Sequence, residues 1–393
     1  MNDSAKLGNL VKTAGIGLAV LGLVAAGIGY TQSGAAAFAG SYLFGWMIWA
    51  SLTFGCLSMT ILFNAVRGRW STPVARIWEA GGGPMGILLI GVLLLPVLLL
   101  FKDQLYGAWL HPHAGDMVVI RKNAYLNQGF WFARIVLYFG IFYFLADRFK
   151  TWTRQEELTG DPAFHQKRNN LSGAAIVLYV LATTFMMTDL VMSIDPHWSS
   201  TMFGFIWVVG GALSAVAFAT FFVVMNGKSE TYKAVLQDKL MTKDFGNMML
   251  MLTMLWTYFT FSQFLITWSG NLPEFTSYYH ARLTGDWNLF GFFQIAFNFL
   301  VPFLLLLSPG VKRDPIRLGI VAAWILVFRF TDVHYIVMPF TRSHISVTIA
   351  DIGCVALVGG VWLANMGFQL AKAPLLTTAH PYLTTPEVAA DAS

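Results

Sequence analysis

The chain has 393 residues, of which 56 % are hydrophobic and only 11 % are charged, and its mean hydropathy is +0.60. A soluble domain carries about 25 % charged residues, so this composition excludes an ordinary soluble protein. The net charge is +5, but the basic residues are scattered over short loops, which does not indicate a nucleic-acid-binding surface.

Apolar segments long enough to cross a bilayer, which takes about 20 residues, follow one another along nearly the whole chain. We expect each to be a helix, because backbone groups in lipid must form hydrogen bonds within their own segment. The predicted fold class is therefore all-α, a polytopic membrane protein with ten transmembrane helices. The predicted spans are 11–30, 37–66, 84–101, 126–147, 172–193, 200–226, 247–269, 286–308, 317–338 and 347–371.

The distribution of basic residues predicts the orientation of these spans. Most of the 25 Lys and Arg residues fall in connections on the side of the two termini, and the positive-inside rule places that side in the cytoplasm. Residues 1–371 then form one integral membrane domain, and residues 372–393 form a cytoplasmic tail. The connections on the other side contain only Lys102, Arg121, Lys122, Arg282 and Arg342.

Two local patterns refine this picture. Segment 72–83 ends in three glycines and is predicted to be a short interfacial helix that stops before the third span. Several tryptophans fall near predicted span ends, where an aromatic belt at the membrane surface explains them. They are Trp46, Trp49, Trp131, Trp198, Trp207, Trp268 and Trp287.

Ionisable side chains within spans are expensive in lipid, so they are functional candidates by default. The candidates gather in the half of the membrane away from the termini, where they predict a polar cavity. Those assigned to chemistry are Asp189, Asp332, His334 and Arg329, and those assigned to a quinol cavity or a proton exit are Arg134, Asp195, His197 and Gln263.

Two interpretations of these residues remain open. In the first, Arg134, Asp189, Arg329 and Asp332 form buried ion pairs that hold helices together. In the second, they exchange protons with a redox-active or transported ligand. Asp189 has no opposite charge nearby on its own helix, so it is the expected proton acceptor. Asp332 and His334 are then a relay, Arg329 a charge partner, and Asp195 and His197 the exit.

The metal-ligand count limits the cofactors. An iron–sulfur cluster normally takes four cysteine ligands, whereas this chain has only Cys56 and Cys354. Of its eight histidines, only His334 lies well inside a span, which argues against haem held by two histidines. We therefore expect no metal to be bound by this chain alone.

Three motifs resemble one family. The first, 188–204, reads TDLVMSIDPHWSSTMFG; the second runs from Asp244-Phe245-Gly246 to Glu274 and includes FSQF and WSGNLPE; the third is RFTD at 329–332, with Pro339 ending the span. In the same order, they resemble segments of the quinone-type membrane subunits of alternative complex III, a quinol:electron acceptor oxidoreductase. These subunits belong to the polysulfide-reductase membrane-subunit (NrfD-like) superfamily, and the chain resembles the second of the two, the ActF type.

The resemblance implies a bacterial cytoplasmic (inner) membrane protein with two four-helix bundles, spans 2–5 and 6–9, flanked by spans 1 and 10. It implies a complex that oxidises quinol and passes electrons towards a cytochrome c or an oxidase. The implied partners are a homologous quinol-site membrane subunit, an iron–sulfur subunit, multihaem cytochrome c subunits, a terminal oxidase and surrounding phospholipids. Haem and iron–sulfur centres then belong to partner subunits.

Two other functions stay open. The chain could be a redox-coupled proton conduit or structural companion that binds no quinol, with Thr183, Thr184, Ser214, Thr220, Thr253 and Asn298 as polar groups in the inner half. It could also be a secondary transporter, although no inverted repeat and no paired broken helices near the midplane are evident.

Overall fold

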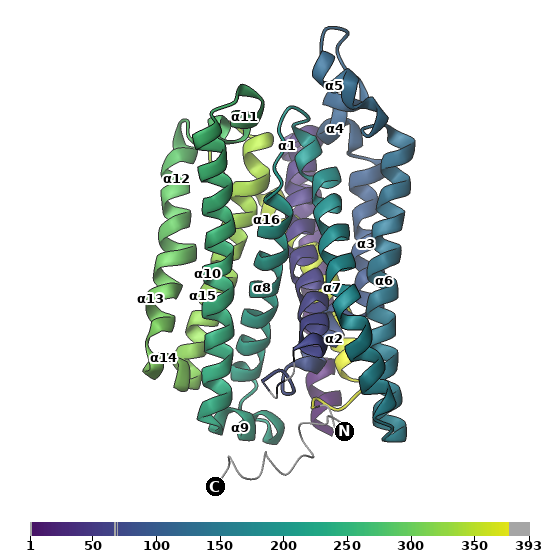
Figure 1. Ribbon diagram of the computed structural model, residues 1–393, viewed down its shortest axis with the longest axis vertical. Helices are drawn as coiled ribbons and strands as arrows, with labels where there is room; N and C mark the ends of the chain where they lie inside the picture. Colours follow the sequence, from purple (N-terminus) through teal and green to yellow (C-terminus); the bar gives the residue numbers. More distant parts are fainter. Residues whose placement is uncertain (1, 67, 69, 377–393) are drawn as a thin grey trace.

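The computed structural model describes residues 2–66, 68 and 70–376 (Figure 1). In this part of the chain the secondary structure is helical, and nine helices are long and apolar enough to cross a membrane. The prediction of an all-helical, multi-pass membrane protein is confirmed. The main helices are α1 (Asn2–Ala65), α3 (Pro84–Leu99), α6 (Gln128–Thr159), α7 (Ala163–Leu190), α8 (Phe203–Met225), α10 (Lys239–Gly270), α12 (Asp286–Gln294) continuing into α13 (Val301–Leu307), α15 (Pro315–Val337) and α16 (Ile349–Leu370).

α1 contains two limbs that run in opposite directions. A straight helix of its 64 residues would be about 96 Å long, roughly three times the hydrocarbon thickness. The chain reverses at Gly34, whose φ of 72° is a backbone conformation that glycine adopts at no steric cost. The first limb (2–33) runs antiparallel to α16, with Gly15 against Ala364 and Gly29 against Ala350.

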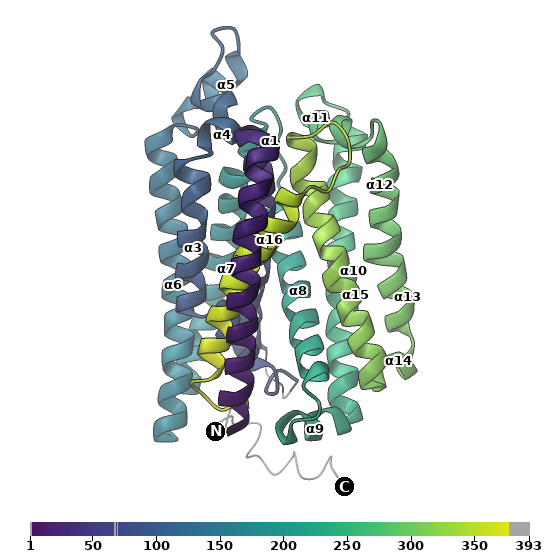
Figure 2. The same ribbon diagram turned by 180° about the vertical axis from the view of Figure 1, so that it is seen from behind.

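The helices form two groups on either side of α16 and the first limb of α1. α3, α6, α7 and the second limb of α1 (35–65) form the first group, and α8, α10, α12–α13 and α15 form the second (Figures 1 and 2). We call the end where α1 begins and α16 finishes the inner end, after the predicted orientation. The outer end carries α4 (Lys102–Leu110), α5 (Met117–Arg121) and α11 (Pro273–Arg282).

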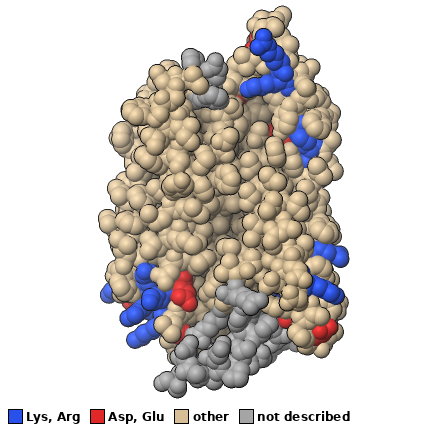
Figure 3. Space-filling model, in the orientation of Figure 1, with Lys and Arg blue, Asp and Glu red and all other residues tan. Residues whose placement is uncertain are grey.

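On the face shown in Figure 3, surface charge is concentrated near the two ends of the molecule. On this face, Lys, Arg, Asp and Glu lie near the ends, and an apolar band separates them. Such a band is the surface that contacts lipid in a membrane protein. Of the predicted tail 372–393, only residues 372–376 are described; the rest lies outside the described residues.

The predicted short helix before the third span is present as α2 (Ala75–Gly82), and it lies inside the protein instead of on its surface. All eight of its residues are buried, and the indole nitrogen of Trp78 donates a hydrogen bond to the Ala215 carbonyl at 3.0 Å. Gly83 is extended and Pro84 begins α3, so the glycines break one long apolar segment. α2 is therefore the buried first section of the third span.

The aromatic-belt interpretation is wrong for most of the tryptophans. Trp46, Trp131, Trp198, Trp207 and Trp287 are at most 2 % exposed, whereas Trp268 is 68 % exposed. Two of the buried indoles donate to carbonyls of neighbouring helices, Trp46 to Ile90 and Trp131 to Asp189, both at 2.9 Å. A buried indole gains packing area and needs only one acceptor, so Trp46 and Trp131 connect neighbouring helices.

Candidate functional site

Arg134 and Asp189 form a buried ion pair between α6 and α7. Arg134 Nε and Nη2 donate to the two carboxylate oxygens of Asp189, each at 2.8 Å. The Tyr138 hydroxyl donates to the same carboxylate at 3.0 Å, and Arg134 Nη1 donates to the Tyr125 carbonyl at 2.8 Å. Asp189 is 0 % exposed. Such a two-pronged bond fixes both the distance and the angle between two helices.

This geometry removes the reason for expecting Asp189 to be the proton acceptor, and the role itself stays a prediction. The expectation depends on the absence of an opposite charge on its own helix, but the partner comes from α6. Three donors already engage this carboxylate. The alternative, a buried ion pair holding helices together, is confirmed for Arg134 and Asp189.

Arg329 and Asp332 form a second buried pair, within α15. They are three residues apart, so they lie on one helix face, and Arg329 Nη1 donates to Asp332 Oδ2. Arg329 Nε also donates to the Ser214 hydroxyl of α8 at 3.3 Å. A side chain at Gly210 would overlap the guanidinium, since a Cβ there would lie 2.4 Å from Arg329 Nη2. Gly210 therefore lets this charge lie directly against α8.

A cavity of about 200 Å³ lies beside Arg329, between the two helix groups. Its polar lining consists of Arg329, Ser214 and Ser51, and the Ser51 hydroxyl is buried with no hydrogen-bond partner among the described residues. The remaining lining is apolar and partly aromatic: Ile48, Trp49, Leu52, Phe218, Phe221, Leu326, Phe330 and Val333. The cavity wall is thus almost entirely apolar, with one cation and two serines whose hydroxyls are buried at its edge.

His334 lies apart from this cavity. Its Nε2 is 3.3 Å from the Ser346 carbonyl oxygen, and its Nδ1 is buried without a partner among the described residues. The ring packs against Phe44 and Trp287, with centroids 5.4 and 5.7 Å away. No described hydrogen bond joins His334 to Asp332, so the expected relay between them lacks a direct link.

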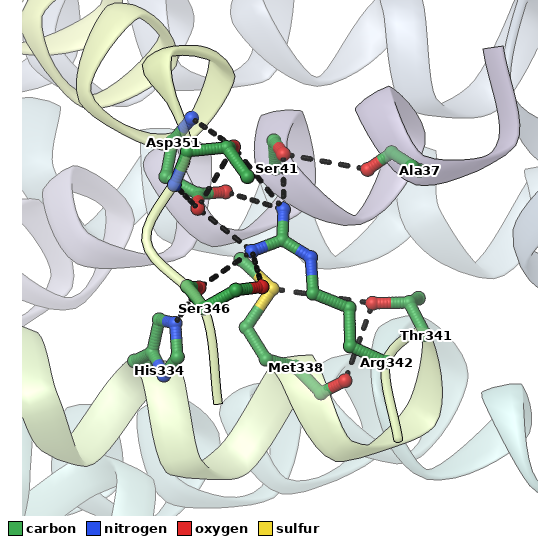
Figure 4. Close-up of polar contacts among 9 residues, drawn as sticks. Ala37, Ser41, His334, Met338, Thr341, Arg342, Ser346 and Asp351 are labelled. Atoms are coloured by element: carbon green, nitrogen blue, oxygen red, sulfur yellow. Dashed lines mark hydrogen bonds and ion pairs between the residues drawn. The ribbon is translucent and has the colours of Figure 1, made fainter. Parts of the chain in front are cut away.

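Arg342 anchors the start of α16 next to His334 (Figure 4). Its Nη1 and Nη2 donate to the two carboxylate oxygens of Asp351, each at 2.8 Å, and Nη2 donates to the Ser41 hydroxyl at 2.9 Å. Asp351 also caps its own helix, in a reciprocal arrangement with Thr348. Sequence reasoning counted Arg342 only as a loop charge, because its partner is visible only once the loop folds back.

Asp195 and His197 lie at the outer end, as predicted. Asp195 accepts a hydrogen bond from the Ser277 hydroxyl of α11 at 2.9 Å, and His197 Nε2 is 2.9 Å from Asp116 Oδ2. The hydrogen bond from the Val119 backbone N–H is the main cause that lowers the pKa of Asp116 below its ordinary value, and the neighbouring His197 adds to this effect. These contacts connect the outer loops of the two helix groups.

Gln263 of α10 is a connector rather than a cavity residue. Its Oε1 accepts a hydrogen bond from the Ser200 hydroxyl at 2.8 Å, and its Nε2 donates to the Tyr279 hydroxyl at 3.3 Å. Gln263 is only 4 % exposed. Its hydrogen bonds therefore connect α10 to the segment before α8 and to α11.

Arg282 is a buried cation that sequence reasoning missed. It is 0 % exposed, and it donates to the carbonyls of Tyr335, Tyr278 and Ile336 at 3.1, 2.9 and 2.6 Å. Its guanidinium also lies 3.4 Å from the centroid of the Tyr278 ring. Burial lowers the pKa of Arg282 from its ordinary value. The residue binds the carboxyl end of α15, where the helix dipole favours a cation.

The structure thus divides the predicted site instead of assembling it into one chamber. Arg134 and Asp189 lie in the first helix group, Arg329 and Asp332 in the second, and Asp189 does not line the cavity beside Arg329. Among the described residues, no three His, Cys, Asp or Glu side chains lie close enough together to hold a metal ion.

A scan against protein-family models and a search of curated proteins found no match to this sequence. The relationship suggested by the three motifs therefore stays a prediction.

Proposed function

We propose that this chain is a membrane subunit of a quinol-oxidising respiratory complex of the alternative complex III type, in a bacterial cytoplasmic membrane. In this proposal ten spans cross the bilayer, because the two limbs of α1 each make one crossing, and both termini are cytoplasmic. The homologous membrane subunit, the iron–sulfur subunit and the multihaem cytochrome c subunits are its partners, and they carry the metal centres. The two helix groups support the proposal, since the resemblance implies two four-helix bundles.

The cavity beside Arg329 is the observation that carries the proposal. A quinol is an apolar ring with two oxygen atoms and an apolar tail, so its site needs apolar walls and a few placed polar groups. Arg329 supplies a charged donor, and the unpartnered Ser51 hydroxyl supplies a second polar group. Ligand cavities measure about 300–1,000 Å³, so 200 Å³ suits a ring whose tail leaves between helices.

In this proposal the residues around the cavity have distinct tasks. Arg329 donates to a ring oxygen and holds its orientation, because a guanidinium makes directional bonds. Asp332 holds the guanidinium in place from within α15. The Ser51 hydroxyl accepts the second hydrogen bond from the quinol, or donates it to the quinol. Arg134 and Asp189 keep the first helix group rigid and take no part in proton transfer.

A pair of serine variants on the same limb of α1 tests the proposal. Ser51→Ala removes a cavity hydroxyl, whereas Ser58→Ala removes a hydroxyl that donates to its own helix, to the Gly55 carbonyl at 2.7 Å. One hydrogen bond contributes about 0.5–1.5 kcal/mol, so we expect KM for quinol to rise about two- to tenfold in the purified complex with Ser51→Ala alone. Arg329→Gln should lower the amount of quinone that copurifies. Unchanged KM and unchanged quinone content would place the quinol site elsewhere.

A second function, a proton conduit coupled to redox in partner subunits, is favoured by a different observation. Buried polar atoms of Thr253, Trp256 and Thr260, spaced along α10, lack partners among the described residues, and Gln294 Nε2 does too. Gln294 is followed by a π-helical turn at Ile295–Leu300, a distortion frequent at functional sites. Buried polar groups without protein partners are where ordered water binds.

Proteoliposomes that contain the complex separate the two functions. If the chain conducts protons, Thr253→Val and Gln294→Leu should lower the number of protons moved per electron while quinol oxidation continues. If it binds quinol instead, both variants should leave that ratio unchanged, and Ser51→Ala should act on KM.

A further inference from the structure

A second cavity, of about 270 Å³, opens at the inner end of the molecule, between α2, α6 and the end of α16. It is separate from the cavity beside Arg329, and no predicted site residue lines it. Its lining combines charged groups with apolar ones: Arg76, Glu79, Ala80, Lys150, Arg154, Glu157, Leu158, Gln369, Leu370, Lys372, Ala373 and Pro374.

Positive charge is in excess in this inner cavity. Four cations and two carboxylates line it, and both carboxylates are already paired with one cation. Arg76 donates to Glu79 at 2.5 Å and also to Glu157. The other three cations, Lys150, Arg154 and Lys372, form no ion pair within 4 Å with any carboxylate of the described residues, and Glu79 attracts Lys150 only from a greater distance.

The excess charge is held in place by its neighbours. Lys150 donates to Gln369 Oε1 at 3.0 Å, which ties α6 to α16. Lys372 lies 3.8 Å from the centroid of the Phe368 ring. Three unpaired cations around one hollow repel one another, and an anion between them would relieve that repulsion.

We propose that this inner cavity binds a phosphate group, supplied by the headgroup of an acidic phospholipid. The inner end is the predicted cytoplasmic boundary of the membrane, and basic pockets between helices at that level bind acidic headgroups. Leu158, which is 71 % exposed on α6, Leu370 and Pro374 supply apolar surface for the glycerol and upper acyl chain. This inference goes beyond the proposed quinol chemistry and does not depend on it.

Lipid titration of the full-length protein in mild detergent tests the proposal. Bound lipid per chain is measured by native mass spectrometry against phosphatidylglycerol and, separately, phosphatidylcholine. A Lys or Arg near a membrane contributes about 1 kcal/mol to binding of an acidic lipid, which is about fivefold in affinity. We expect Lys150→Gln and Arg154→Gln each to weaken phosphatidylglycerol binding about fivefold, and together about 25-fold.

Controls keep the result interpretable. Arg148→Gln removes a cation two residues from Lys150 that does not line the cavity and that pairs with Asp147, so it should bind lipid like the wild type. If the α6 variants fail to fold, Lys372→Gln changes a cation beyond the end of α16 and should still weaken binding about fivefold.

Three results would overturn the assignment. Equal binding of phosphatidylcholine and phosphatidylglycerol would mean that the cations do not select the lipid. Displacement of phosphatidylglycerol by inorganic phosphate would assign the cavity to a free anion. If a chain truncated after Leu376 binds the lipid but the full-length chain does not, the occupant of the cavity is instead the chain's own terminal segment, through the acidic side chains Glu387 and Asp391.

Discussion

Asp189→Asn is expected to destabilise the protein instead of slowing a proton-transfer step. The substitution keeps the shape of the side chain but leaves the Arg134 guanidinium, 7 % exposed, without its counter-charge. Two guanidinium–carboxylate hydrogen bonds of 2.8 Å are affected, each worth about 1.5–3 kcal/mol. Removing one partner of a buried ion pair costs about 3–5 kcal/mol. We therefore expect a loss of about 4 kcal/mol in the free energy of unfolding.

A double-mutant cycle isolates this pair. The two single variants of the cycle, Arg134→Met and Asp189→Leu, should each cost about as much as Asp189→Asn, because each leaves one buried charge unpaired. The double variant Arg134→Met/Asp189→Leu should recover most of the loss, since apolar replacements of similar volume are often neutral. Arg148→Met is the matched control on α6: its side chain is 42 % exposed, and an exposed pair contributes at most about 1 kcal/mol.

The assay is unfolding of the purified protein by sodium dodecyl sulfate in mixed micelles, followed by tryptophan fluorescence. The reasoning is refuted if Asp189→Asn unfolds at the wild-type midpoint, or if the losses in the two single variants simply add in the double variant. A folded, stable Asp189→Asn protein with lowered quinol turnover would restore Asp189 as a proton acceptor.

Three further changes test other parts of the structure. Gly15→Ala should lower the free energy of unfolding by about 1–3 kcal/mol, because its Cβ would lie 2.4 Å from a backbone nitrogen of α16. The control Gly17→Ala, whose Cβ would have nothing within 4 Å, should be neutral or stabilising by up to about 1 kcal/mol. Equal unfolding midpoints for the two variants would contradict the packing of α1 on α16. Arg282→Met should cost about 3 kcal/mol, because three carbonyls lose a charged donor, and Arg282→Lys should restore little of it, since Lys lacks the planar fork; a wild-type midpoint in Arg282→Met would contradict this. The pKa of Asp116 is lowered in the folded protein, so its contribution to stability is complete above its ordinary pKa of 3.8 and is lost as pH falls through the lower folded value. Amide hydrogen exchange in residues 111–127 of the wild type should therefore accelerate in strong acid. Asp116→Asn should abolish this acceleration.

The spans were predictable because hydropathy is a local property of the chain. A segment whose backbone must form its hydrogen bonds internally in lipid is recognisable by its length and composition. The boundaries predicted for α8 and α15 fall within three residues of those observed. The third span was predicted too short, because the buried helix α2 continues it beyond the three glycines.

The partners of the charged residues were not predictable in the same way. Arg329 and Asp332 share one helix, so their spacing alone indicated a pair. Arg134 and Asp189 are 55 residues apart, and Arg342 meets Ser41 across 301 residues. Spacing along a chain says nothing about which faces of distant helices meet, so Asp189 looked unpaired.

Hydropathy and composition are enough to predict a helical membrane protein, the approximate segments that are long and apolar enough to span a bilayer, and the few side chains that are costly to hold there. Packing of the helices determines which of those charges neutralise each other and which face a cavity. The physical reason is that transfer into lipid is summed residue by residue along the chain. The fate of a buried charge, in contrast, depends on the groups within a few ångströms of it, which packing brings from distant segments.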